Sequence, residues 1–458
     1  MGIMVAMAMF WIVWENFIFK YCKESRVWYQ FFGAGLVVRS DLGSPDCEAI
    51  SERLLSSSTS SRELKQATRR SKPLDAFRGL SLVVMIFVNY GGGGYWFFRL
   101  SYWNGLTVAD LVFPWFVFIL GVSAVISLSN SECHGVSRWS ILLKVVRRFI
   151  ILSVLGLFLN KSSDLATFRI PGVLQRLAVC YLMICLLHLC FSPRPDTTRR
   201  APSRFSICEI RYYLIQWFLA LDLVLGYVLI TYLVHKSDCP DQYLGPGGKL
   251  GDGGKYMNAN CTGGAAGYID ELVFSHDHIY QTPTCKKMYE TGPYDPEGML
   301  GTLTSIFLSF LGVHAGRIFL LYRDKHQRMI RWTVNGIVFG ISGAGLCCFQ
   351  QNGGLIPINK NLWSVSYTLV MAGISFILLT IFYYVIDIKK WWTGAPFYFL
   401  GMNSILVYVG HRMVKGYFPF DWESDLTYVH LMIRNVTGTV LWVAIAAYLH
   451  YIKLFVKV

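Results

Sequence analysis

Polar side chains that could take part in chemistry interrupt the long apolar stretches of this 458-residue sequence. Asn89 is followed by Tyr90 and four consecutive glycines, and His411 closes a motif that begins at Gly401. An unpaired amide or imidazole surrounded by apolar groups is costly, so each side chain predicts either a cavity that binds a ligand or a structural hydrogen bond between helices. Both alternatives stay open for Asn89, whereas a lone histidine such as His411 is more often a satisfied hydrogen-bonding group than a catalyst.

A second group of polar residues lies where apolar stretches begin. Asp110 opens one of them, after a short connection shaped by Asn104 and Gly105. A carboxylate at that position can cap the N-terminus of a helix, where negative charge is favoured, or it can face a ligand. Arg176 lies one turn into another stretch, and its charge requires an anion, which can be a carboxylate of a neighbouring helix or a bound ligand.

The glycines at 91–94 indicate how such groups could face a cavity. Each glycine in a helix costs about 1 kcal/mol relative to alanine, so a helix with four in a row is expected to unwind or to pack very closely there. Unwound backbone at membrane depth usually lines a cavity.

The elements that carry these residues are predicted to be membrane helices. The sequence is 54% hydrophobic and only 15% charged. A bilayer core takes about 20 apolar residues per helix, and runs of that length recur about eleven times, which predicts an all-α polytopic membrane protein. The expected spans are 2–19, 79–98, 108–128, 141–159, 171–191, 212–234, 299–322, 332–349, 362–386, 395–414 and 436–455.

The distribution of Lys and Arg predicts the orientation of these helices, because basic residues are held on the cytoplasmic side. The connection 20–75 carries ten of them, whereas the segment 235–298 sets nine acidic residues against five lysines. The N-terminus is therefore expected in the lumen and the C-terminus in the cytosol. Three N-x-[ST] sequons, at Asn160, Asn260 and Asn435, fall on the side that the charges assign to the lumen, where they could carry glycans.

The formal charge of +14 follows the same bias. Nothing in the sequence resembles a basic stripe with interleaved aromatic residues, so nucleic-acid binding is not expected. A polyphosphorylated ligand on the cytosolic side would also be attracted by this charge.

The chain divides into three parts. Residues 1–20 are expected to form the first membrane helix, 21–77 a Ser-rich cytosolic linker, and 78–458 a ten-helix membrane body. The body includes the lumenal loop 235–298, whose glycine-rich run predicts a compact cap.

Three cysteines of the loop are expected in an oxidising compartment, which permits a disulfide. We expect Cys239 to pair with Cys261 and Cys285 to remain unpaired.

Eight motifs follow one another along almost the whole chain, among them Trp103-Asn104-Gly105 and Asn403-Ser404-Ile405. The motifs occupy residues 75–79, 87–93, 103–116, 169–176, 243–248, 261–270, 295–298 and 401–411. Together they resemble the lysosomal heparan-α-glucosaminide N-acetyltransferase family. The resemblance implies eleven helices in the lysosomal membrane, cytosolic acetyl-CoA as acetyl donor, and the terminal glucosamine of heparan sulfate as lumenal acceptor.

The resemblance also suggests roles for individual residues. Arg78 and Arg176 are expected to contact the CoA phosphates, since arginine suits bidentate phosphate contacts. Other motif residues are assigned to donor binding, namely Asn403 and His411, and to acceptor binding, namely Asn104 and Asp110. Membrane lipid, the sugar chain and a second copy of the chain in a homodimer are the expected partners.

One position departs from the family. The family's catalytic histidine stands eleven positions after the motif asparagine and three before the motif tryptophan, and this sequence has Leu100 there, which cannot accept a proton. Asn89 matches the motif asparagine and can donate a hydrogen bond to a tetrahedral intermediate. Asp277 and His278 could supply the base. Two functions therefore stay open: an acetyltransferase impaired by Leu100, or a non-catalytic member that binds or conducts an acyl-CoA or a sugar.

Overall fold

The computed structural model describes residues 71–160, 168–192, 208–211, 213–234, 236–251, 258–352, 354–423 and 427–456. The first helix expected at 2–19 and most of the linker expected at 21–77 lie outside these ranges. Within them the regular structure is helical, apart from one isolated bridge between Asn104 and Asn359.

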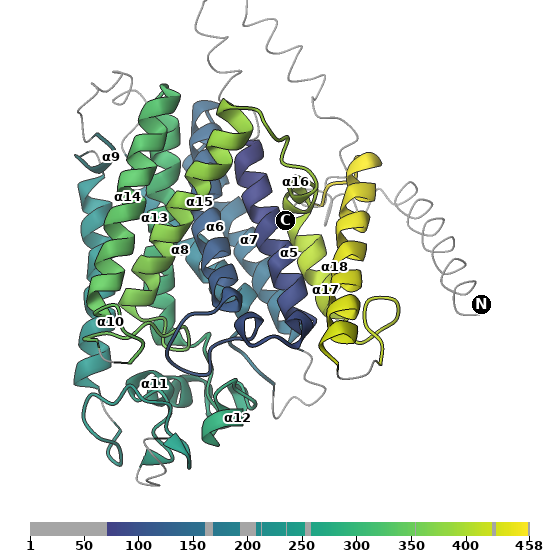
Figure 1. Ribbon diagram of the computed structural model, residues 1–458. Helices are drawn as coiled ribbons and strands as arrows, with labels where there is room; N and C mark the ends of the chain where they lie inside the picture. Colours follow the sequence, from purple (N-terminus) through teal and green to yellow (C-terminus); the bar gives the residue numbers. More distant parts are fainter. Residues whose placement is uncertain are drawn as a thin grey trace, which may run out of the picture.

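Nine long helices form the body of the described chain (Figure 1). They are α5 (Lys72–Asn89), α6 (Val108–Cys133), α7 (Arg138–Leu159), α8 (Val173–Phe191), α10 (Leu214–Leu233), α13 (Met299–Leu321), α14 (Lys325–Leu346), α15 (Val365–Tyr383) and α18 (Tyr428–Tyr451). Six of the described helices, namely α6, α8, α10, α13, α18 and α15 with its π-helical extension to Ile388, are long and apolar enough to cross a membrane.

Two expected spans differ from the helices in the structure. The span expected at 79–98 ends at Asn89, and two short 3-10 turns, η2 (Gly92–Gly94) and η3 (Trp96–Phe98), follow. The span expected at 395–414 is broken at Asn403 into α16 (Phe397–Met402) and α17 (Ser404–Met413). In addition, α5 already begins at Lys72, inside the segment expected as a linker.

The centre of the bundle depends on small residues between α6 and α13. A Cβ atom added to Gly121 would lie 1.9 Å from the carbonyl oxygen of Ser309, and one added to Gly312 would lie 2.1 Å from that of Phe118. The Ser309 hydroxyl donates to the carbonyl of Val117 at 3.0 Å. Two backbones therefore approach each other as closely as is usual where small residues face each other in membrane bundles.

Every second connection between successive helices lies at the same end of the bundle, at the bottom of Figure 1. The amide of Gly105 donates to the carbonyl of Ile358, that of Ile170 donates to His278, and the Trp103 indole donates to Leu244. Successive helices therefore run in opposite directions, as the alternation of basic and acidic connections predicts.

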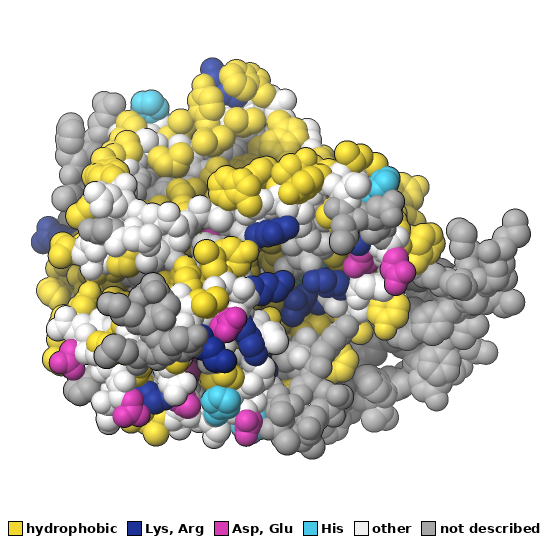
Figure 2. All heavy atoms as spheres, turned by 60° about the horizontal axis from the view of Figure 1, so that its bottom comes forward, with side chains coloured by type: hydrophobic (Ala, Val, Ile, Leu, Met, Phe, Trp, Pro, Cys, Tyr) yellow, Lys and Arg dark blue, Asp and Glu magenta, His cyan; other side chains and the backbone are white. Residues whose placement is uncertain are grey.

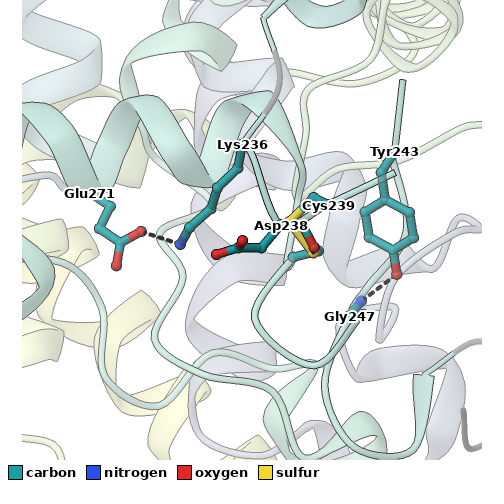
Figure 3. Close-up of a disulfide and its surroundings, with 7 residues drawn as sticks. Lys236, Asp238, Cys239, Tyr243, Gly247 and Glu271 are labelled. Atoms are coloured by element: carbon teal, nitrogen blue, oxygen red, sulfur yellow. Dashed lines mark hydrogen bonds and ion pairs between the residues drawn. A yellow bond between two sulfur atoms is a disulfide. The ribbon is translucent and has the colours of Figure 1, made fainter. Parts of the chain in front are cut away.

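Residues 236–251 and 258–298 fold over this end and contain α11 (Ala265–Phe274), η8 (His276–His278) and α12 (Lys286–Tyr289). The predicted pairing of Cys239 with Cys261 is confirmed, and Cys285 is buried and unpaired. Near the disulfide, Lys236 pairs with Glu271 at 2.8 Å, and the Gly247 amide donates to the Tyr243 hydroxyl at 2.9 Å (Figure 3).

We predict that Gly312→Ala lowers the free energy of unfolding by about 1–3 kcal/mol, because the added methyl group forces α6 and α13 apart. The control is Gly226→Ala on α10, where an added Cβ meets nothing within 4 Å. Thermal unfolding of the detergent-solubilised protein measures the difference. Equal unfolding temperatures for the two variants would contradict the packing described here.

Candidate active site

A cavity of about 1020 Å³ lies between α5, α6, α7, α8 and α17. Ser71 and Arg78, near the start of α5, line it, and so do Asn89 and Leu100, at and beyond the other end of that helix. Thr282, in the segment that covers the bottom of the bundle, lines it as well. The same cavity therefore reaches both ends of α5.

Two arginines line the cavity near the start of α5. Arg78 donates to the Asp75 carboxylate at 3.3 Å and to the Ser123 hydroxyl, which connects α5 with α6. The Arg148 guanidinium of α7 lies 4.5 Å from the centre of the Tyr181 ring. Arg148 could not be predicted as a lining residue, because basic residues at the start of a membrane span are already explained by the orientation of the helix.

Apolar side chains separate the two polar ends of the cavity. The lining between them comes from four helices and includes Leu82, Met85, Phe116, Leu120, Leu152, Leu174 and Leu177. A bound molecule that reaches from one end to the other must therefore place an uncharged section along this part.

At the far end of α5, the structure brings Asn89 and His411 together. The Nδ2 atom of Asn89 lies 3.0 Å from Nε2 of His411, and Nδ1 of His411 lies 3.1 Å from the carbonyl oxygen of Val407. Nδ1 must carry the proton to donate to that carbonyl, so Nε2 accepts from the Asn89 amide. His411 is fully buried behind Asn89 and does not line the cavity. It therefore holds Asn89 in place, and its predicted contact with the donor stays a prediction.

The chain unwinds directly after Asn89, as the glycines predict. Gly91 has φ +123° and Gly92 has φ +59°, backbone angles that residues with a side chain rarely adopt. A Cβ atom on Gly92 would also lie 2.5 Å from the Cβ of Phe98. The unwound segment turns back beneath α5 and carries Leu100 into the wall of the cavity.

Asp110 anchors this segment. Its Oδ2 accepts from the amide of Ser101 at 3.2 Å and from the amide and hydroxyl of Thr107 at 3.0 and 2.9 Å, and its Oδ1 lies 3.7 Å from Nζ of Lys360. The carboxylate is fully buried and does not line the cavity, whereas Lys360 does. The helix-capping alternative is therefore confirmed for Asp110, and an acceptor-binding role stays a prediction.

A second ionic group joins the 168–172 connection to the start of α13. Arg169 contacts both carboxylate oxygens of Asp295 at 2.7 Å and Glu297 at 2.6 Å, and Arg169 and Glu297 line the cavity. Burial raises the pKa of Asp295 in spite of Arg169. Burial would also raise the pKa of Glu297, but the charges of Arg169, Arg176 and Lys360 together lower it below its usual value. Glu297 therefore stays ionised.

Two residues predicted to bind the donor, Arg176 and Asn403, contact other parts of the protein in this structure. Arg176 is buried near the start of α8, where it donates to the carbonyl of Gly298 at 2.8 Å and lies 5.0 Å from the ring of Trp363. It does not line the cavity and belongs to the opposite end from Arg78. Asn403 is fully buried and binds the backbone of Leu454 and Val456, both at 3.0 Å.

The acceptor-side predictions also need correction. The Asn104 side chain bonds to Asn352 at 2.9 Å and to Asn359 at 3.0 Å, which fastens two connections to each other outside the cavity. His278 has Nδ1 2.9 Å from the carbonyl oxygen of Phe168, and the side chain of Asp277 is 71% exposed. Neither Asp277 nor His278 lines the cavity, although the next residues, Ile279 and Tyr280, do.

Of the three sequons, only Asn260 has an exposed side chain. The Asn160 nitrogen that would carry a glycan donates to the carbonyls of Arg169 at 2.8 Å and Pro171 at 3.3 Å. Asn435 is 1% exposed inside α18. The amides of Asn160 and Asn435 are part of the packed body, so we expect neither to carry a glycan.

Comparisons with known proteins agree with the motif analysis. Residues 99–211 match a family described as a Domain of unknown function (DUF5009). Over 433 residues, which are 92% of this chain, the sequence is 43% identical to the heparan-alpha-glucosaminide N-acetyltransferases of Mus musculus and Homo sapiens. The predicted family resemblance is confirmed. The chain spans 65% of the length of each of these N-acetyltransferases.

For this relative of the N-acetyltransferases, we predict that Asn260→Gln removes one N-linked glycan, because Asn260 is exposed beside the disulfide. Asn160→Gln and Asn435→Gln should leave the glycan content unchanged. Electrophoretic mobility after expression in cells with a secretory pathway, with and without enzymatic deglycosylation, measures the result. Loss of a glycan in either of the last two variants would show that the described burial is incorrect.

A pH dependence follows from Asp270 of α11, which is 1% exposed and accepts the amide of Met299 at 2.8 Å. Burial raises the pKa of Asp270 to about 7, although the bond from Met299 opposes this. The folded chain then holds a proton that the unfolded chain releases from about pH 4 upward, so this residue makes stability fall as the pH rises from about 4 to about 7.

We predict that Asp270→Asn flattens this part of the pH profile, because asparagine can still accept from Met299 but does not titrate. Unfolding temperatures of the original chain and of Asp270→Asn, measured across the same pH range, test this prediction. Asp277→Asn, at an exposed position, is the control. An unchanged slope in Asp270→Asn would rule out the assignment.

Proposed function

We propose that this chain is a transmembrane N-acetyltransferase that moves an acetyl group from acetyl-CoA to the terminal glucosamine of heparan sulfate. The observation that carries the proposal is the single cavity that reaches both ends of α5 and has Asn89 in its wall. The identity with heparan-alpha-glucosaminide N-acetyltransferases supports the choice of donor and acceptor.

In the proposed topology the chain has eleven membrane helices, a lumenal N-terminus and a cytosolic C-terminus, in the lysosomal membrane. The end of the cavity near Arg78 then faces the cytosol, and the end near Thr282 faces the lumen. The acidic balance of the 235–298 segment and the exposed sequon at Asn260 support this orientation.

We assign the CoA phosphates to the cytosolic end, where Arg78 and Arg148 line the cavity. At the helical rise, Arg78 and Asn89 lie about 16 Å apart along α5, a distance that the extended pantetheine arm of CoA can bridge. The apolar lining between them suits the uncharged part of that arm and places the thioester near Asn89.

In the proposed reaction the free amine of glucosamine attacks the carbonyl carbon of the thioester and produces a tetrahedral intermediate with a negatively charged oxygen. Its collapse breaks the carbon–sulfur bond, and the proton that the nitrogen loses ends on the sulfur of CoA. Asn89 uses one hydrogen of Nδ2 toward His411, so its second hydrogen is available to stabilise the oxygen.

The reaction also needs a group that takes the proton from the amine, and none of the described lining residues is a histidine. Leu100 lines the cavity where the family has its catalytic histidine, and Glu297 is held by Arg169. We therefore propose that the acceptor must arrive as a free amine, which makes the transfer slow.

Leu100 equally favours a second function, in which the chain binds an acyl-CoA or a sugar and does not transfer the acetyl group. The two functions differ in turnover and not in donor binding. Calorimetry with acetyl-CoA, carried out beside a transfer assay with glucosamine, therefore separates them.

We predict that Leu100→His raises the rate of acetyl transfer to glucosamine by about 10²–10⁴-fold, the range that a positioned general base contributes. Leu106→His is the control, because Leu106 lies in the same connection but is exposed and does not line the cavity. If neither the original chain nor folded Leu100→His transfers acetyl groups, the catalytic proposal fails. If, in addition, acetyl-CoA does not bind to the chain, both proposed functions fail.

A further inference from the structure

Arg412 differs from most of the other cations of the cavity; Arg148, which also has no carboxylate partner among the described residues, lies against the Tyr181 ring instead. Arg412 lies at the end of α17, is half-buried and lines the cavity. Arg78, Arg169 and Lys360 also line it, but each of them has a carboxylate partner: Asp75, the pair Asp295 and Glu297, and Asp110. In the described part of the chain, Arg412 has neither a hydrogen bond nor an ion pair.

The surroundings of Arg412 increase its need for an anion. Lys415 follows it on the connection after α17, and the pKa of Lys415 is lowered, first by burial and then by the charge of Arg412. The nearest carboxylate of this connection, that of Asp421, is engaged by Arg434 at 3.3 Å. Two positive charges therefore lie close together, and Asp421, whose charge also acts on Lys415, is paired with Arg434.

The position of Arg412 is next to the reacting end of the cavity. His411, its neighbour in sequence, accepts the hydrogen bond from Asn89, and Asn89 and Arg412 line the same cavity. Figure 2 shows the end of the molecule at the bottom of Figure 1, which the cavity reaches, and Lys and Arg side chains gather near the middle of that face. An anion bound by Arg412 would thus lie beside the group that contacts the acetyl donor.

We propose that Arg412 binds an acidic group, a carboxylate or a sulfate, on the sugar that follows the terminal glucosamine of the acceptor. A guanidinium can hold such an oxyanion through two parallel hydrogen bonds, which fixes both the distance and the orientation of the neighbouring amine. Arg412 is then a specificity-determining residue that distinguishes an acidic acceptor chain from a neutral one. The inference rests on the proposed function, because it assigns this end of the cavity to the acceptor.

Equilibrium binding tests the proposal without requiring turnover. The probes are a disaccharide of glucosamine linked to a uronic acid and the matching disaccharide of glucosamine linked to glucose, titrated into the full chain in detergent. The original chain should bind the acidic probe at least about tenfold more tightly, as expected for a hydrogen-bonded charge. Arg412→Gln should abolish the difference, and Lys287→Gln, which removes an exposed charge from the same end of the molecule, should keep it.

The alternatives have distinct results. A preference for the acidic probe that survives in Arg412→Gln, or its absence in the original chain, overturns the proposal. Weaker binding of acetyl-CoA in Arg412→Gln, with unchanged binding of the acidic probe, would assign Arg412 to the donor and also overturn it. If inorganic sulfate binds to Arg412 as tightly as the acidic probe, the site takes a free anion and not an acceptor chain.

Two further measurements keep the test decisive. Arg412→Lys retains the charge and should retain part of the preference, which covers the case in which Arg412→Gln does not fold. Acetyl transfer to glucosamine alone, which lacks the acidic sugar, tests the proposed function separately. No transfer to glucosamine together with an intact, Arg412-dependent preference would reject the enzyme and leave the anion site standing.

Discussion

The buried carboxylate of Asp110 determines the shape of the wall near Asn89. It caps α6, binds the backbone next to Leu100 through the Ser101 amide, and pairs with Lys360 from a distant part of the sequence. A buried charge is stable only when hydrogen bonds and an opposite charge compensate for its lost hydration, and Asp110 has both. Without it, the unwound segment after α5 would lose its anchor and Lys360 its partner.

That wall belongs to a cavity whose two ends differ in chemistry. Arginines at the start of α5 suit phosphates, an apolar section follows, and the other end combines the Asn89 amide with charged groups from three connections. In the proposed function this arrangement would keep the charged part of the acetyl donor at one end and the amine at the other, with the uncharged arm of the donor between the helices. The small residues between α6 and α13 let these two helices pack as closely as their backbones allow, and the cavity lies between other pairs of helices.

Much of the fold could be predicted from local sequence, but fewer of the site residues could. Apolar runs locate the helices, and the glycines at 91–94 locate the break in α5, because both effects act over a few neighbouring residues. The partners of Asn403, Arg176 and Asn435 are remote in sequence, so no local pattern distinguishes a structural side chain from one that faces a ligand. Arg148 was missed for the converse reason: its charge had a sufficient explanation in the orientation of the helices.

The break between α16 and α17 has a consequence for the order of assembly. Asn403 lies at this break and is bound by the backbone of residues 454–456. The helix that follows the break supplies Tyr408 and Arg412 to the cavity. A ribosome must therefore synthesise α18 and residues 454–456 before α17 can be fixed, so the passage between the two ends closes only after this later part of the chain has been made.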